Sequence, residues 1–373
     1  MSEAQSLITI LARLPDPRIE RSREHELTDL LVIAVCTLLV GGESFYDMED
    51  FGHAREEWLR GFLRLPNGIP SHDTFNRLFQ ALDPAAFAET FAQWTQGLRE
   101  RLEREVVALD GKAARRATVA GQNPRHLVSA WATENGLTLG QRQVSEKSNE
   151  ITAVPALLRQ LELAGCIVTA DALHCQKTIA KEITEADADY VLALKGNQGT
   201  VHAEVRMYLD DAIARQEPAL ATHTTVDKGH GRLETRRYWQ SDRLAWFADR
   251  AEWPGLRSVG VVEATRETGG ETTVERRYYL SSLPVDVATF ARAVRGHWAV
   301  ENQLHWVLDV VFGEDQSRAR TGHAVANLGL LRRLALNLLR RDKTCKRGAK
   351  GKQLNAALKP DYLLRLLTAT PTI

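Results

Sequence analysis

The spacing of apolar residues divides the chain into a helical first part and a second part that contains strands. In residues 1–98 apolar positions recur every three or four residues, which is typical of amphipathic helices. Glycine and proline interrupt the pattern, as at Gly41-Gly42 and Asp83-Pro84. We therefore predict an all-α domain over residues 1–98, with helices at Leu27–Val40, Phe45–Phe62, Ser71–Leu82 and Ala85–Glu105.

From residue 106 the pattern changes to short apolar runs that are rich in β-branched residues. These runs predict strands at Val106–Leu109, His126–Thr133, Leu137–Val144, Cys166–Thr169 and Tyr190–Leu194. Asn135-Gly136 is a strong hairpin signal. Helices are expected at Pro155–Ala164 and Gln176–Ala186, which gives the order βββαβαβ. We predict an α/β fold with a mixed sheet, as in RNase H-like nucleotidyl-transfer domains, although topology alone names no function.

After a helix near 200–215, strand patterns return without helices between them, so residues 218–283 are expected to form a β-rich insertion. Its polar, arginine-rich strands are predicted at Ala221–Val226, Leu233–Trp239, Leu256–Arg266 and Thr272–Ser281. A helix to about Val311, bent at Gly296, and a helix at Ala324–Leu339 should follow. The expected division is a helical domain at 1–98, a catalytic core at 99–217 and 284–340, the insertion at 218–283 and a basic tail at 341–373.

Charge is zero in total but unevenly distributed. Residues 1–98 hold 15 acidic and 8 basic side chains, whereas residues 317–352 hold 11 basic side chains and one acid. This asymmetry predicts a segment that binds a polyanion, with a solvated amphipathic helix as the alternative. The four cysteines are scattered, which favours a reducing cytoplasm. The apolar run Leu30–Val40 is too short to span a membrane, so no membrane partner is expected.

Two predicted buried strands each end in an aspartate. Asp110 follows Val106–Leu109 and begins an Asp-Gly-Lys sequence, and Asp171 follows Cys166–Ala170. Such Asp–Gly pairs often form only turns. However, ligand chemistry in α/β sheets gathers at the carboxyl ends of strands, and a shared cation would explain both acids.

A third carboxylate is expected from a helix that packs on the sheet, and Glu301 is the best candidate. His297, Glu301 and His305 are spaced four residues apart and share one helix face. The alternative is a surface stripe; a zinc site is disfavoured because no HExxH pattern is present. Asp309 and Glu314-Asp315 are rival candidates.

Four motifs together resemble the DDE transposases of bacterial insertion sequences, in particular the H-repeat-associated type found beside Rhs loci. They are Leu109–Lys112, Thr169–His174, Leu194–Gln198 and the run from His297 to Asp309. Leu14-Pro15-Asp16-Pro17-Arg18 and the run from Ile69 to Phe75 resemble that family's helical associated domain.

This resemblance implies that Asp110, Asp171 and Glu301 form an acidic triad that binds two Mg²⁺ ions, with Mn²⁺ as a substitute. It implies strand cleavage at insertion-sequence ends and strand transfer to target DNA. Double-stranded DNA with terminal inverted repeats, a homodimer or higher multimer, and a bacterial cytoplasmic location associated with the nucleoid are then expected. The Y-x2-R-x3-E-x6-K signature of related transposases falls on Val294, His297, Glu301 and Leu308, so only the glutamate matches.

Basic and aromatic side chains near these motifs are candidates for DNA binding through phosphate contacts or base stacking. They are Lys112, Arg115, Arg116, Lys195, Arg295, His297 and Trp298. Trp306 is a further stacking candidate, with core packing as the alternative. In the insertion His230, Arg232, Arg236 and Arg237 could contact a phosphate backbone or form a solvated face. A domesticated DNA-binding protein and a metal-dependent nuclease without joining activity are the competing functions.

Overall fold

A computed structural model of the chain describes residues 7–100, 102–114, 116, 125–144, 150–229 and 232–368. The chain forms two compact units. The first unit comprises Met1–Glu100, Gly111–Ala153 and Glu301–Ile373, and the second comprises Arg101–Asp110 and Val154–Val300. The fold is a mixed α/β fold in which one strand, β1, passes from the second unit into the first.

The first unit is mainly helical. Its α-helices are α1 (Leu7–Leu11), α2 (Leu27–Val40), α3 (Phe45–Ala54), α4 (Glu56–Leu59), α5 (His72–Ala81), α6 (Pro84–Leu98), α11 (Trp306–Val310), α12 (Ala324–Arg341), α13 (Ala349–Leu358) and α14 (Pro360–Thr368). Local signals fix several ends. Ser44 caps α3 in a capping box, Ser71 caps α5, and Gly41 ends α2 with a φ of 98°, which favours glycine.

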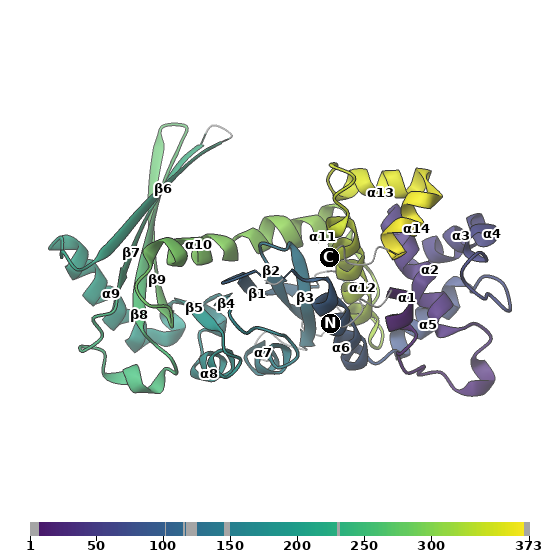
Figure 1. Cartoon of the computed structure of the whole chain (residues 1–373), viewed down its shortest axis with the longest axis horizontal. Helices are drawn as coiled ribbons and strands as arrows, with labels where there is room; N and C mark the ends of the chain where they lie inside the picture. Colours follow the sequence, from purple (N-terminus) through teal and green to yellow (C-terminus); the bar gives the residue numbers. More distant parts are fainter. Residues whose placement is uncertain are drawn as a thin grey trace. The chain divides into compact units, whose positions relative to one another are not determined.

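The core of the first unit surrounds α12, which packs against α2, α5, α6 and β3 (Figure 1). Every residue of α12 from Ala324 to Leu339 is buried, and α2 is buried over almost its whole length. Among the described residues, no single helix is both long and apolar enough to cross a membrane. Within the same residues, one pair of helices, α2 and α3, is long and apolar enough when taken together, but the two helices are bent by 94° relative to each other.

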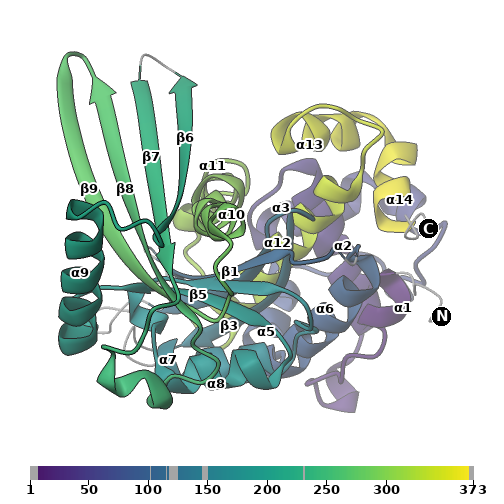
Figure 2. The ribbon, with the colours of Figure 1, turned by 60° about the vertical axis from the view of Figure 1, so that its left-hand side comes forward.

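The strands within the described residues form one nine-stranded sheet in the order β3-β2-β1-β4-β5-β9-β8-β7-β6. Their bounds are β1 (Val106–Ala113), β2 (His126–Ala132), β3 (Leu137–Val144), β4 (Ile167–Ala170), β5 (Asp189–Leu194), β6 (Ala221–Gly229), β7 (Arg232–Ser241), β8 (Ser258–Thr268) and β9 (Glu271–Ser281). β1, β4 and β5 are parallel neighbours, whereas the remaining described pairings are antiparallel. Figure 2 shows β6 to β9 as four long strands side by side. The predicted insertion therefore extends the same sheet through β5 and β9.

Helix α10 (Val287–His297) packs on β4, β5, β6 and β7 within the second unit. The unit also contains α8 (Lys177–Glu185) and α9 (Gly199–Ala214), and α7 (Glu150–Leu158) begins in the first unit and continues into the second. The ring of Phe290 lies over Gly260, where a Cβ would come within 2.5 Å of the ring. Gly296 similarly allows α10 to approach Val106 of β1, because a Cβ there would lie 3.1 Å from the valine side chain. Gly260 thus allows the first half of α10, and Gly296 its C-terminal end, to lie close to the sheet.

Several predicted boundaries were wrong. The helix predicted at Phe45–Phe62 breaks at Arg55, whose backbone (φ −125°, ψ 17°) is not helical, and α3 and α4 result. The helix predicted to reach Glu105 ends at Leu98, because Arg99 is extended and the amide of Glu100 donates to Asn135 Oδ1 at 2.9 Å. The predicted helix Pro155–Ala164 starts earlier and ends at Leu158, with Pro155 inside it.

The C-terminal basic stretch also differs from its prediction. Residues 341–368 do not form a plain tail, since α13 and α14 lie within them. Nor is the basic segment a solvated helix, because Arg332 and Arg333 of α12 are buried. The Lys352 ammonium donates to the carbonyls of Leu339 and Asp342 at 2.7 and 2.6 Å. Much of this positive charge therefore serves internal contacts.

Candidate metal centre

The two predicted aspartates lie at neighbouring positions of the sheet in the second unit. β1 and β4 are parallel, and Leu109 pairs with Ala170, so Asp110 and Asp171 each come one residue after this pair. β1 continues to Ala113, so Asp110 lies within the strand rather than after it. The sequence pattern missed this continuation, because the apolar run ends at Leu109 while the backbone remains extended.

Asp171 is held by His174. It caps the short 3-10 helix η3 (Ala172–His174), and its Oδ1 accepts from the His174 amide at 3.3 Å and lies 2.8 Å from His174 Nδ1. Burial alone would raise the pKa of Asp171, but the hydrogen bonds and charge of His174 outweigh burial and lower it. The carboxylate is therefore ionised at neutral pH, as a cation ligand requires.

His297 ends α10 and lies near both aspartates. Its Nδ1 is 3.1 Å from Thr169 Oγ1 on β4. Burial lowers the pKa of His297, and the negative charges of Asp110 and Asp171 only partly oppose this effect. The imidazole is therefore mainly neutral at neutral pH, and it lies among the strand-end acids rather than on an open surface. His297 was predicted to contact DNA, and its ring lies beside these two aspartates.

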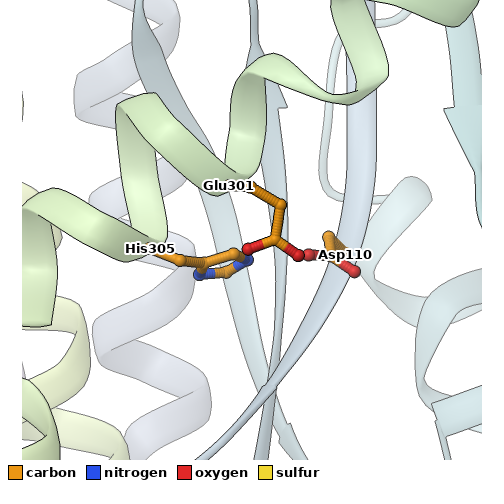
Figure 3. Close-up of side chains that lie close together, drawn as sticks. All are labelled: Asp110, Glu301 and His305. Carbon is orange, nitrogen blue, oxygen red and sulfur yellow. The ribbon is translucent and has the colours of Figure 1, made fainter. Parts of the chain in front are cut away.

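Glu301 and His305 lie in a π-helical turn, η6 (Glu301–His305), which follows α10 and leads into α11. Single π-helical turns inside α-helices occur frequently at functional sites. Glu301 is exposed and His305 is buried. Asp110, Glu301 and His305 each offer a ligand atom, and these atoms lie within 4.8 Å of one another (Figure 3).

This group differs in part from the predicted triad. It contains Asp110 and Glu301 but has His305 in place of Asp171, whose carboxylate contacts His174. His305 was expected to share a helix face with Glu301, but it was not assigned as a ligand. The four-residue spacing of Glu301 and His305 is the signal that could have indicated His305 as a ligand. The roles of His174 and Thr169 beside the acids were also missed.

The rival acids have other partners, all within the first unit. Lys112 donates to Asp309 and to Glu314, the latter at 3.1 Å, and lies 3.3 Å from Asp315. Glu314 also accepts from the buried Arg333 at 2.7 Å. Burial would raise the pKa of Glu314, but the charges of Arg333 and Lys112 outweigh it and lower the pKa to about 2. These contacts favour Glu301 over Asp309 and Glu314 as a cation ligand.

Comparisons with known proteins identify the family of this chain. The family model described as "Transposase DDE domain" matches residues 101–338, and a "DDE_Tnp_1-associated" model matches residues 8–95. The chain belongs to the DDE transposase family. The associated domain coincides with the helical segment that precedes β1.

Relatives agree with this membership over the whole chain. "Putative transposase YncI" of Escherichia coli O157:H7 is 39% identical over 98% of this chain and 95% of its own length. "H repeat-associated putative transposase YhhI" of Escherichia coli strain K12 is 36% identical over 99% of both chains. A solved cryo-EM structure, titled as a piggyBac transposase synaptic complex with hairpin DNA, covers 98% of this chain and 80% of that chain at 12% identity and a TM-score of 0.46.

The predicted DNA contacts of this DDE family member have different surroundings. Lys195 at the end of β5 and Arg116 are exposed, and Arg115 lies outside the described residues. Arg295 is half-exposed and lies 3.6 Å from Asp227. Trp298 is 40% exposed, and the Arg277 guanidinium lies 4.3 Å from the centre of its ring. Lys112 alone among these described cations is enclosed by several acids.

The basic residues predicted as contacts in the insertion are largely paired with acids. Arg236 contacts Asp227 and Glu234, and Arg237 lies 3.8 Å from Glu263. Arg232 lies 3.7 Å from Glu234, and His230 is outside the described residues. The side chains of Arg232 and Arg237 are exposed beside these acids, whereas only 11% of the Arg236 side chain is exposed.

Proposed function

We propose that this chain is a metal-dependent DNA transposase that cleaves the ends of an insertion sequence and joins them to target DNA. Asp110, Asp171 and Glu301 would hold two Mg²⁺ ions, with Mn²⁺ as a substitute. The observation that carries the proposal is the adjacent position of Asp110 and Asp171 on paired parallel strands, with Glu301 beside Asp110. The strand order β3-β2-β1-β4-β5 supports an RNase H-like core within residues 99–340.

The donor set fits the proposed ions. Carboxylate oxygens are the ligands that Mg²⁺ prefers, whereas imidazole nitrogen suits transition metals better. We therefore assign the ions to the three carboxylates and leave His305 outside the proposed set. When bound, two such ions activate the attacking oxygen of water or a DNA 3′-hydroxyl and stabilise the leaving oxygen of the phosphodiester.

The residues around the carboxylates would orient them. His174 fixes the Asp171 carboxylate through its amide and ring. Thr169 holds the His297 ring near both aspartates, where a neutral imidazole could exchange a proton with the reacting groups. Such partners commonly hold ligand side chains in their binding orientation.

Double-stranded DNA is the proposed substrate, with terminal inverted repeats and a target duplex bound by a homodimer or higher multimer in the bacterial cytoplasm. The exposed cations Lys195, Arg116 and Arg295 would contact phosphates, which position DNA without reading its sequence. Trp298 would stack on a base, and the helical residues 1–98 would form the associated domain.

The test is cleavage and joining of a duplex that carries the inverted repeats flanking this gene, with Mg²⁺ or Mn²⁺. Asp110→Ala, Asp171→Ala and Glu301→Ala should each lower cleavage by about a thousandfold or more, because each removes several kcal/mol of transition-state stabilisation. Asp211→Ala, a change to an exposed acid on α9, should leave cleavage unchanged.

Full activity of any of the three alanine variants would contradict the assignment. DNA binding without metal-dependent cleavage by the wild type would instead indicate a DNA-binding protein that no longer transposes. Cleavage without joined products would indicate a nuclease.

A further inference from the structure

We propose that the ion cluster of Lys112, Asp309, Glu314, Asp315 and Arg333 is a positioning device that sets the orientation of Asp110 and Glu301. This inference rests on the proposed function, because it assigns the cluster to the same metal centre. It gives Lys112 a role other than the DNA contact expected from the sequence.

Lys112 is the centre of the cluster. Only 12% of its side chain is exposed, and its ammonium contacts Asp309, Glu314 and Asp315. An ammonium group has three donors, and three carboxylates surround it here. An ammonium held in this way has little capacity left for a phosphate.

The cluster extends through Glu314 to α12. Arg333 donates to Glu314 at 2.7 Å, to the Gly329 carbonyl at 2.9 Å and to Ser129 Oγ at 3.0 Å. Both side chains are buried, with 0% of Arg333 and 5% of Glu314 exposed. The network thus joins β1, β2, α12 and the short helix η7 (Glu314–Gln316) within the first unit.

The charges of the cluster are largely balanced. Its three acids face Lys112 and Arg333, and the charge of the buried neighbour Arg332 also lowers the pKa of Glu314. Buried charges are costly unless they are paired in this way. Apolar residues of similar volume often stabilise a core as well as an ion pair does, so stability alone does not explain the five buried or half-buried charges. Fixed geometry is the property that such a network supplies.

The cluster holds the two chain segments that carry the proposed ligands. Side chains two residues apart point to the same face of a strand, so Lys112 and Asp110 lie on one face of β1. Asp309 lies on α11, which follows directly from the π-helical turn of Glu301 and His305. The Lys112–Asp309 contact therefore fastens the strand just after Asp110 to the helix just after Glu301.

The experiment measures Mn²⁺ binding directly, by electron paramagnetic resonance titration of the full-length protein. Lys112→Met should weaken Mn²⁺ binding about 10- to 100-fold, the range typical for the loss of residues that orient metal ligands. Asp309→Asn, which removes charge but keeps shape, should weaken it about 10-fold. Saturating Mn²⁺ should restore most of the cleavage activity in both variants.

Lys352→Met is the matched control, because Lys352 is also a buried lysine of the first unit but donates to backbone carbonyls. It should lower the melting temperature and leave the Mn²⁺ affinity unchanged. A role of Lys112 limited to stability would give the same result for Lys112→Met.

Wild-type Mn²⁺ affinity in folded Lys112→Met and Asp309→Asn variants would overturn the proposal. If Lys112→Met does not fold, Asp309→Asn decides, since this carboxyl is partly exposed and the amide keeps its shape. Wild-type protein that binds Mn²⁺ but cuts no DNA would contradict the proposed function, while the Mn²⁺ affinities of the variants would still decide on the positioning role. Wild-type protein that binds no Mn²⁺ would overturn both.

Discussion

Two groups of acids differ in the side chains that face them. Asp110 and Asp171 lie near His297 and His174, and the pKa of His297 is lowered by burial. Asp309, Glu314 and Asp315 instead face permanently charged lysine and arginine. The His297 ring carries little positive charge because burial lowers its pKa, whereas the ammonium and guanidinium groups that face the second group are charged. The second group is balanced by the protein itself.

This contrast gives a criterion for separating ligand carboxylates from structural ones in such proteins. Acid type and position in the sequence do not separate them, since both groups follow apolar segments. The two groups are separated by the basic side chain that faces them, which is histidine in the first group and lysine or arginine in the second. If the criterion holds, changes to the first group should affect metal-dependent cleavage, and changes to the second should affect folding and the precision of the metal site.

The largest effect is expected from Arg333→Met, which leaves Glu314 buried without its main cation. Breaking a buried pair in this way typically costs about 3–5 kcal/mol. Urea unfolding followed by circular dichroism measures the loss. Arg159→Met is the control, because Arg159 pairs with Glu182 while 64% of its side chain is exposed, and exposed pairs contribute little. Equal stability of the two variants would show that the cluster is not a structural one.

The elements that hold the first group could be predicted from local patterns. The apolar runs before Asp110 and Asp171 indicated buried strands, whereas the direct parallel pairing of these two strands was not predicted. Glu301 was indicated by its helical spacing from His297. These signals lie within a few residues of the side chains that they concern.

The second group could not be predicted in the same way. Lys112 meets Asp309 and Glu314 across 197 and 202 residues, and no local pattern encodes such a contact. In the sequence, the arginines of α12 look like the polar face of a solvated helix, and only the structure shows that Arg333 has a buried partner. The π-helical turn at Glu301–His305 was missed because an inserted residue barely changes helical periodicity. Similarly, the pairing of β9 with β5 depends on a long-range contact.

A smaller loss of stability is expected when the pH is lowered enough to protonate Glu314. Its folded-state pKa of about 2 is below the ordinary value of 4.5, so its stabilising contribution is complete above pH 4.5 and is lost as the pH falls toward 2. Protonation removes the charge but keeps the shape, which should cost about 1.5–3 kcal/mol. Glu314→Gln should therefore flatten the stability profile between pH 4.5 and 2 in urea unfolding. Asp211→Asn should keep the wild-type slope; a wild-type slope in Glu314→Gln would contradict the balanced cluster.

The smallest effect concerns the two tryptophans on either side of the π-helical turn. Trp306 is 57% exposed, whereas Trp298 is 40% exposed and has the Arg277 guanidinium over its ring. An open aromatic face can stack on an unpaired base, while an occupied one must first lose its cation–π contact. Trp306→Ala should weaken binding of a single-stranded oligothymidine by about 1 kcal/mol, or roughly fivefold, in a fluorescence anisotropy titration. Trp298→Ala should weaken it less, and Arg277→Ala should make the two tryptophans more alike. An equal or larger loss of affinity for Trp298→Ala would mean that the Arg277 guanidinium does not block stacking. The facing side chain would then decide the role of a residue in the buried acid groups but not at these exposed tryptophans.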